Sequence, residues 1–325
     1  MSDLFTTIKG QVTGKNVRIV LPEGTDERIV GAAARLQKEN IVKPILLGNK
    51  AEIEAKAKEI GVSVEGIAIH EPATDPLFDE LVAAFVERRK GKATEEAARK
   101  MLVDPNYFGT MLVYTGKAEG LVSGAAHSTG DTVRPALQII KTKPGVGKVA
   151  GAMIMVRGEE RYLFSDVAIN IAPVAADLAE NAIVSAETAE IFGIDPRVAM
   201  LSFSTKGSAK SDETEKVVEA TSLAKEKAPG LTLDGEFQFD AAFVPTVAEK
   251  KAPGSVIKGD ANVFIFPSLE AGNIGYKIAQ RLGNFEAVGP ILQGLNAPVN
   301  DLSRGCNTDD VYNLTLITAA QAVNK

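Results

Sequence analysis

Segments with the length and apolarity of buried strands alternate along this chain with segments of helical periodicity. Apolar runs at residues 18–22 and 45–48, and a weaker one at 62–69, predict strands, and the apolar positions of residues 29–36 and 77–86 recur at helical spacing. The later part repeats the alternation, with strand patterns at 149–156, 162–166, 198–203 and 263–266 and helical patterns at 177–191, 213–227 and 274–282. Strands that alternate with helices of this length are typical of βαβ units in a parallel sheet. The sequence therefore predicts an α/β fold.

The 325 residues exceed what one hydrophobic core comfortably serves, which predicts two domains. Residues 141–148 are rich in lysine, glycine and proline and have the composition of a linker. Residues 290–298 are predicted to return the chain, so that a C-terminal helix rejoins the first domain. The predicted domains are therefore 1–144 plus 297–325, and 145–296, with a cleft between them.

Composition argues against several classes of protein. The formal net charge of −6, the 6% aromatic content and the lack of tryptophan argue against a nucleic-acid partner. A single cysteine, Cys306, excludes an intrachain disulfide, and with only two histidines a zinc site is not expected, so no metal is predicted. The N-terminus lacks the pattern of a signal peptide, and no stretch reaches the roughly twenty apolar residues of a membrane span. A cytoplasmic protein without membrane contact is predicted.

Residues 300–311 concentrate side chains that can carry chemistry. They hold Ser303, Arg304, the only thiol and two adjacent carboxylates, and they run into an apolar helical pattern with Asn307 or Thr308 as N-cap. A guanidinium beside the N–H groups of a helix start favours phosphate or carboxylate. The alternative stays open, because carboxylates in a first turn also fit a plain complement of the helix dipole, worth about 0.3–1 kcal/mol each.

A second polar segment follows a predicted strand at residues 119–123. Small residues lead to Ser128 and Thr129, then to a helix with Arg134 one turn in. A strand, a turn of small residues, hydroxyls and a helix start together allow backbone N–H groups to approach an oxyanion. Phosphate binding is therefore predicted for Ser128 and Thr129, the alternative being that one of them is only the N-cap.

A basic cluster at residues 87–92 ends the predicted helix 77–86. Cations in a last turn suit the helix dipole, so this cluster by itself favours a solvated helix end over a polyphosphate site. The glycines of residues 145–151 precede a strand instead of following one, so they do not form a dinucleotide fingerprint.

Four sequence blocks, taken together, resemble those of the phosphate acetyltransferase family. The blocks are Leu21–Gly24, Ser123–Gln138, Pro267–Asn273 and Asn300–Cys306. The resemblance covers essentially the whole chain and matches the short form of the family. It implies reversible acetyl transfer between coenzyme A (CoA) and inorganic phosphate, with CoA as a substrate and no separate cofactor. It also implies two α/β domains around a cleft, similar to isocitrate and isopropylmalate dehydrogenases, and a homodimer.

The resemblance also implies roles for individual residues. Asp310 matches the family's general base for the CoA thiol, Ser303 the serine that hydrogen-bonds the acyl oxygen, and Arg304 the arginine that holds phosphate. Arg134 and Arg88 match arginines that contact the CoA phosphates. The Arg88 match rests on a short motif with a second arginine beside it. Residues 307–309 depart from the small, aliphatic and acidic residues expected there, while the position of the base is kept.

The sequence leaves two routes for the acyl group open. Cys306 could carry it in a ping-pong route, but direct transfer in a ternary complex is the favoured prediction. Ser303 is not expected to be a nucleophile, because neither histidine forms a recognisable triad with it.

Three rival functions are compatible with parts of the sequence. A phosphate butyryltransferase would use the same chemistry with a longer acyl pocket. A decarboxylating dehydrogenase of similar fold would need metal and nicotinamide. A module that senses acetyl phosphate or CoA would bind without turnover.

Overall fold

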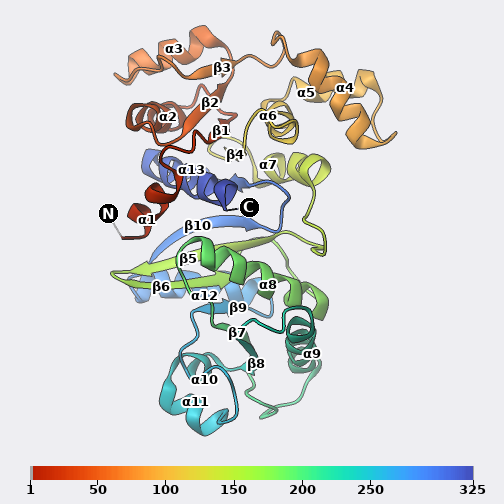
Figure 1. Cartoon of the computed structure of the whole chain (residues 1–325), viewed down its shortest axis with the longest axis vertical. Helices are drawn as coiled ribbons and strands as arrows, with labels where there is room; N and C mark the ends of the chain where they lie inside the picture. The colour runs from red at the N-terminus through yellow and green to blue at the C-terminus, as the bar shows by residue number, and fades with distance from the viewer. Residues whose placement is uncertain (1–2, 325) are drawn as a thin grey trace. The chain divides into compact units, whose positions relative to one another are not determined.

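The computed structural model describes residues 3–324 and confirms the predicted α/β class. Its strands form two sheets, and most strands are joined along the chain by helices (Figure 1). Contacts divide the chain into two units. The N-terminal unit comprises Phe5–Thr142 together with the segment from Leu295 on, and the middle unit comprises Lys143–Gly294 together with Asp3 and Leu4. The predicted domain limits and the predicted similarity to isocitrate and isopropylmalate dehydrogenases stay predictions.

A five-stranded sheet forms the centre of the N-terminal unit. Its strand order is β11-β4-β1-β2-β3, and every neighbouring pair is parallel. The strands are β1 (Arg18–Leu21), β2 (Lys43–Leu47), β3 (Ala68–His70), β4 (Gly120–Ser123) and β11 (Val299–Asp301). All four residues of β4 are buried, as expected for an apolar run inside a parallel sheet. The weak strand predicted at residues 62–69 is observed only as β3, Ala68–His70. Residues 60–67 instead form turns that follow the helix ending at Glu59.

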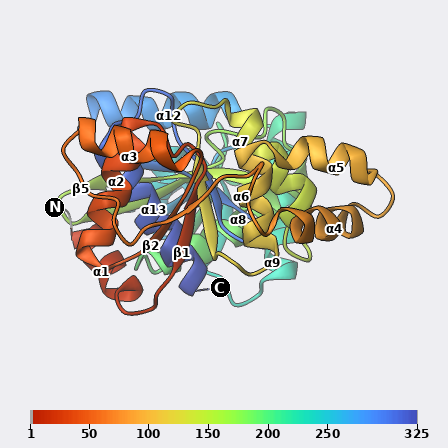
Figure 2. The ribbon, with the colours of Figure 1, turned by 90° about the horizontal axis from the view of Figure 1, so that it is seen from above.

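Two groups of helices flank this sheet, seen from above in Figure 2. One group contains α2 (Glu27–Glu39), α3 (Lys50–Glu59) and α13 (Thr308–Val323), and the other contains α4 (Phe78–Arg89), α5 (Glu95–Leu102), α6 (Pro105–Tyr114) and α7 (Thr129–Pro135), which continues into the π-helical turn η1 (Ala136–Ile140). The first helix, α1, spans Asp3–Val12. Polar side chains cap several helices, as Asp26 caps α2 by accepting from the N–H of Arg28 at 2.9 Å.

The middle unit contains a six-stranded mixed sheet of order β10-β5-β6-β9-β7-β8. Its strands are β5 (Ala150–Arg157), β6 (Glu160–Ser165), β7 (Val198–Leu201), β8 (Leu233–Phe237), β9 (Val263–Ile265) and β10 (Glu286–Gln293). The predicted strand pair is confirmed as the antiparallel β5–β6 hairpin. The return connection predicted at residues 290–298 is wrong for its first part, because β10 continues to Gln293 past an irregularity between Val288 and Ile291.

Helices cover both faces of the middle sheet. Small aliphatic side chains of α8 (Ala175–Ile191) and α9 (Asp212–Lys227) form the core on one face. An aromatic-rich core fills the other face, beneath α10 (Phe239–Phe243), α11 (Pro245–Lys251) and α12 (Leu269–Leu282). Across residues 3–324, no helix is both long enough and apolar enough to cross a bilayer.

Candidate active site

Strand β11 delivers residues 302–307 to the carboxyl end of the parallel sheet, where ligands gather in open α/β folds. Asp301 pairs with Ser123 of β4, and the N–H of Leu302 donates to the Ser123 carbonyl at 2.7 Å. Gly124 follows at a φ of 110°, and a Cβ there would lie 2.5 Å from Oδ1 of Asp301. A side chain at this position would collide with Asp301, so the glycine is what lets the loops after β4 and β11 lie side by side.

Helix α13 begins immediately after this loop. Asn307 is the N-cap and accepts from the Asp310 N–H at 2.9 Å, which confirms one of the two predicted caps. In return, Oδ2 of Asp310 accepts from the Asn307 N–H at 2.9 Å. The Asp310 residue is exposed, so this reciprocal capping orients its carboxylate without burying it.

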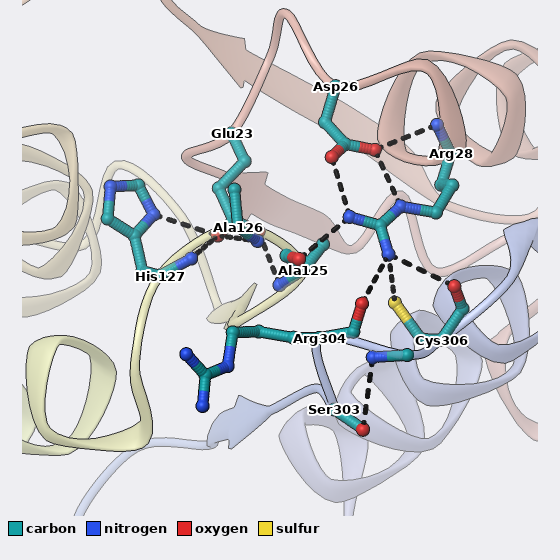
Figure 3. A network of polar contacts seen from close by, with 10 residues as sticks. Glu23, Asp26, Arg28, Ala125, Ala126, His127, Ser303, Arg304 and Cys306 are labelled. Atoms are coloured by element: carbon teal, nitrogen blue, oxygen red, sulfur yellow. Dashed lines mark hydrogen bonds and ion pairs between the residues drawn. The ribbon is translucent and has the colours of Figure 1, made fainter.

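Ser303 and Arg304 stand on the exposed part of the same loop. The Ser303 hydroxyl oxygen accepts from the Gly305 N–H at 3.2 Å, which leaves its proton free to donate elsewhere. Within residues 3–324 the Arg304 guanidinium has no hydrogen-bond or ion-pair partner, and it extends away from the surrounding network (Figure 3). The loop thus presents a hydroxyl donor and an uncommitted guanidinium.

Arg28, on α2, connects this loop to the rest of the unit (Figure 3). Its Nη1 donates to the carbonyls of Arg304 and Cys306 at 2.8 and 3.1 Å. Its Nη2 donates to the Ala125 carbonyl at 2.7 Å, and its ion pair with Asp26 is also 2.7 Å long. The sequence prediction did not include Arg28 or Asp26.

Glu23 organises the loop after β4. Its buried carboxylate accepts from the backbone N–H groups of Ala125, Ala126 and His127 at 2.8, 2.7 and 2.8 Å, and lies 2.8 Å from Nδ1 of His127. The prediction that backbone N–H groups of this turn face a substrate oxyanion is therefore wrong for these three, because a protein carboxylate already occupies them. Glu23 was missed as well, and its only local signal was a carboxylate in the turn after a buried strand.

Ser128 and Thr129 both donate their hydroxyl protons to carboxylates. Ser128 is the N-cap of α7, as one of the alternatives predicted, and its Oγ donates to Asp131 at 2.7 Å. Thr129 donates to Oδ2 of Asp301 at 2.6 Å. Both residues are exposed, so each hydroxyl oxygen also faces solvent.

The arginines predicted to contact CoA differ in their surroundings. Arg134 is exposed, and a Cβ at Gly130 would lie 3.9 Å from its Nη2, which places the guanidinium beside the first turn of α7. Arg88 donates through Nε and Nη2 to the carbonyls of Ile139 and Ile140 at 2.6 and 3.2 Å. Arg88 therefore ties α4 to the end of η1 and keeps three further N–H donors.

Cys306 is buried beside Arg28, whose Nη1 lies 3.6 Å from Sγ. Burial raises the pKa of the thiol, and the nearby Arg28 guanidinium opposes this shift only partly. A thiol with a raised pKa is a weak nucleophile at neutral pH. This environment disfavours an acyl carrier at Cys306.

Asp301 is a buried carboxylate at the end of β11, 4% exposed. Oδ2 accepts from Thr129, whereas Oδ1 has no hydrogen-bond partner within residues 3–324. Burial raises the pKa of Asp301; the Thr129 hydrogen bond opposes the shift, and the charge of Glu23 adds to it. Asp301 lies two residues before Ser303 and is a further carboxylate to which the sequence analysis assigned no role.

The raised pKa of Asp301 predicts a pH-dependent effect of Asp301→Asn on stability. The folded protein keeps this proton to higher pH than the unfolded chain, so the contribution of Asp301 to stability falls as pH rises through its folded pKa. Asparagine still accepts from Thr129 and carries no charge. The variant should match wild type in its free energy of unfolding near pH 4 and be more stable than wild type near pH 7, because only wild type then has to bury a charge or keep a proton there.

Chemical denaturation at several pH values measures this difference. Asp79→Asn is the control, because the Asp79 side chain is 81% exposed and its replacement should shift stability by less than about 1 kcal/mol at any pH. A deficit of Asp301→Asn that stays constant with pH would contradict the assignment.

A hollow of about 490 Å³ lies at the carboxyl ends of β1 and β2. It is lined by residues 22–26, 47–49 and 126–127 with Glu52 and Pro105. The lining thus includes Glu23 and His127 but none of the site residues predicted from the sequence.

Within residues 3–324, no group of three or more His, Cys, Asp or Glu residues is arranged to hold a metal ion.

Comparison with known proteins places this chain in a family. Residues 3–319 match the family model described as phosphate acetyl/butaryl transferase. The phosphate acetyltransferase of Bacillus subtilis is 72% identical over 323 residues, covering 99% of this chain and 100% of that protein. A phosphotransacetylase structure from Streptococcus pyogenes superposes with a TM-score of 0.98 at 57% identity, covering 100% of both chains, and the EutD phosphotransacetylase of Staphylococcus aureus gives 0.95 at 62% identity, covering 98% of both. The chain therefore belongs to the phosphate acetyl/butaryl transferase family.

Proposed function

We propose that this chain transfers an acetyl group reversibly between CoA and inorganic phosphate, through the side chains of residues 303–310. Family membership and the 72% identical phosphate acetyltransferase support the reaction. The observation that carries the assignment of the site is the loop itself, which presents the Ser303 hydroxyl, the Arg304 guanidinium and the Asp310 carboxylate in exposed positions between β11 and α13.

Each of these three groups supplies one requirement of the chemistry. A free thiol has a pKa of about 8.5, so CoA must lose a proton, and Asp310 accepts it. The thiolate then attacks the carbonyl carbon of acetyl phosphate, and Ser303 donates a hydrogen bond to the oxygen that becomes negative. The bond between that carbon and the bridging oxygen breaks, the electron pair leaves with phosphate, and Arg304 holds the phosphate through two parallel N–H donors.

The acyl group passes directly from phosphate to CoA in this proposal. A ping-pong route would need a protein thiolate, and the one thiol of the chain is buried and has a raised pKa. Among residues 3–324, the Ser303 hydroxyl likewise has no hydrogen bond to a base; its oxygen accepts from the Gly305 N–H. Direct transfer in a ternary complex therefore fits the surroundings of Cys306 and Ser303 best, because it uses neither residue as a nucleophile.

The substrates are proposed to extend along the N-terminal unit beyond the reacting loop. Ser128 and Thr129 would bind phosphate by rotating hydroxyls that now donate to Asp131 and Asp301. Arg134 would meet a CoA phosphate with its exposed guanidinium, and Arg88 would do so with the N–H donors not used on η1.

Positive charge around Arg88 supports a polyphosphate partner there. The Arg88 guanidinium is the largest cause of a lowered pKa at Lys141, followed by slight burial and the nearby Lys90 and Lys92. Arg89 donates to the Gln138 carbonyl at a long 3.4 Å, so either arginine of the pair can present donors to a phosphate.

The decisive experiment follows release of free thiol from acetyl-CoA by the purified protein without added metal. The proposal expects release only when phosphate is present, with acetyl phosphate formed in equal amount. Release without phosphate would identify a thioesterase instead, and binding without release would identify a sensing module.

Acyl-chain preference is tested in the same assay. The family description includes both acetyl and butyryl transfer, and one extra methylene changes binding in an apolar pocket by only about 1–3 kcal/mol. The proposal expects acetyl-CoA to have the highest kcat/KM in a comparison with propionyl- and butyryl-CoA. A preference for butyryl-CoA would assign the chain to the other activity of its family.

We also propose a homodimer, as the family resemblance implied, and a cytoplasmic location, as the sequence pattern predicted. An exposed apolar stripe on α12 supports self-association: Ile274, Ile278 and Leu282 are 58%, 53% and 81% exposed and recur at helical spacing. Light scattering should give twice the 34.3 kDa chain mass, and Ile278→Lys should shift the mass toward the single chain. A single-chain mass for the unmodified protein would contradict the dimer.

A further inference from the structure

Arg28 uses all five of its guanidinium N–H groups on three segments of the N-terminal unit (Figure 3). Nε and Nη2 donate to the two oxygens of Asp26 at 2.9 and 2.7 Å. Nη2 also donates to the Ala125 carbonyl, and Nη1 donates to the carbonyls of Arg304 and Cys306. A planar guanidinium has five donors in a fixed geometry, so these acceptors saturate it.

The two carbonyls bound by Nη1 lie on either side of Gly305. Holding them fixes the peptide planes that follow Arg304 and Cys306, and with them the direction in which neighbouring side chains leave the backbone. Figure 3 shows the result: the Arg304 carbonyl faces Arg28, and the Arg304 guanidinium extends the opposite way. The backbone of the reacting loop is therefore oriented by a side chain that is absent from the loop itself.

Arg28 is itself held rigidly. Its side chain is 23% exposed, and that of Asp26 is 17% exposed. The hydrogen bond from Arg28 lowers the pKa of Asp26 against the opposing effect of burial, so the pair stays ionised at neutral pH. Ala125, whose carbonyl accepts from Arg28, is also held in place, because its N–H donates to Glu23 at 2.8 Å. Neither the guanidinium nor its acceptors can move without breaking several hydrogen bonds.

We propose that Arg28 is a positioning residue for acyl transfer, which holds the Ser303–Cys306 loop against the Ala125 loop so that Ser303 and Arg304 face the reacting groups. This inference rests on the proposed function of the loop. Arg28 itself has no donor left for substrate. Because a displacement of about 1 Å can cost about 10²-fold in rate, its loss should appear chiefly in kcat.

Arg28→Lys tests the proposal with the charge retained. A lysine has three donors around one nitrogen and cannot span carbonyls on two loops while it pairs with Asp26. In the direction that forms acetyl-CoA, kcat should fall by about 10–10²-fold, while the KM for CoA stays within about twofold of wild type. Circular dichroism and thermal unfolding show whether the variant is folded. Asp26→Asn, which removes the charge that pairs with the Arg28 guanidinium, should lower kcat by a smaller factor.

Arg18→Lys is the matched control in the same unit. Arg18 begins β1, at the end of the strand away from Glu23, and its guanidinium forms an ion pair with Glu119 and donates to the Gly116 carbonyl at 3.0 Å. It thus combines a carboxylate and a carbonyl acceptor as Arg28 does, without contact to the reacting loop. Its replacement should leave kcat and both KM values at wild-type levels.

A double-mutant cycle separates positioning from general stabilisation. If Arg28 acts through Arg304, the loss of kcat/KM for acetyl phosphate caused by Arg28→Lys should be markedly smaller when Arg304→Ala is already present. Losses that simply multiply, or an Arg28→Lys variant with wild-type kcat, would overturn the inference. If Arg304→Ala alone keeps wild-type activity, the proposed function of the loop fails instead, so the two failures are distinguishable.

Discussion

Replacing Asp310 by asparagine is expected to lower kcat at neutral pH by about 10²–10⁴-fold, the usual contribution of a general base. An asparagine oxygen can still accept from the Asn307 N–H that Asp310 accepts from at 2.9 Å, so the start of α13 is preserved. What is lost is the ability to take the proton of the CoA thiol. The loss should shrink as pH approaches about 8.5, where the free thiol is half ionised.

Asp309→Asn is the matched control for this variant. The neighbouring carboxylate is 76% exposed and forms an ion pair with Arg35 at 2.9 Å, so its replacement changes the charge of the same helical turn. Stopped-flow or steady-state assays of acetyl-CoA formation across this pH range compare the two. Wild-type turnover in Asp310→Asn at neutral pH, or an equal loss in Asp309→Asn, would exclude Asp310 as the base.

Arg304→Ala is expected to lower kcat/KM for phosphate by about 10²–10⁴-fold, with a far larger rise in the KM for phosphate than in the KM for CoA. Two charge-assisted hydrogen bonds are lost, each worth about 1.5–3 kcal/mol. The Arg304 side chain is exposed and has no protein partner within residues 3–324, so the fold should not change. Arg304→Lys should recover only part of the loss, because an ammonium cannot form the planar pair of bonds.

Ser303→Ala provides the comparison within the same loop. Its hydroxyl is assigned to the acyl oxygen, so its loss should lower kcat by about 10²–10³-fold with little change in the KM for phosphate. Initial rates with phosphate and acetyl-CoA varied independently distinguish the two patterns. A larger effect of Arg304→Ala on the KM for CoA than on that for phosphate would refute the assignment of Arg304.

Local sequence patterns predicted the reacting loop well because its signals lie within a few residues of one another. The polar run, the N-cap and the apolar period after Val311 correspond to the observed loop, to Asn307 as cap and to α13. Asn300 and Asp301, the first two residues of that polar run, belong to β11, because parallel pairing with β4 extends the strand through polar residues that no apolar pattern marks. The sequence thus indicated where the helix starts more accurately than where the strand ends.

The supporting residues could not be predicted in the same way. Arg28 contacts the Arg304 carbonyl across 276 positions of sequence, and Glu23 contacts the Ala125–His127 turn across about a hundred. Locally, each is only a charged residue near a strand end or a helix start, and such residues are most often solvated. Strand β10 was missed for a different reason, since Gly289 and Pro290 interrupt its pattern while an irregularity accommodates them within the strand.

The pairing of β11 with β4 has a consequence for biosynthesis. The strand that carries the reacting loop emerges from the ribosome after nearly all of the protein it completes, because it begins only at Val299. Until then β4, whose residues are all buried in the finished protein, has an open edge beside it that can recruit a foreign strand. Translation of residues 299–310 therefore both covers this edge of β4 and supplies the residues assigned to catalysis. A chain truncated before Val299 is expected to lack activity and to aggregate through the same exposed edge.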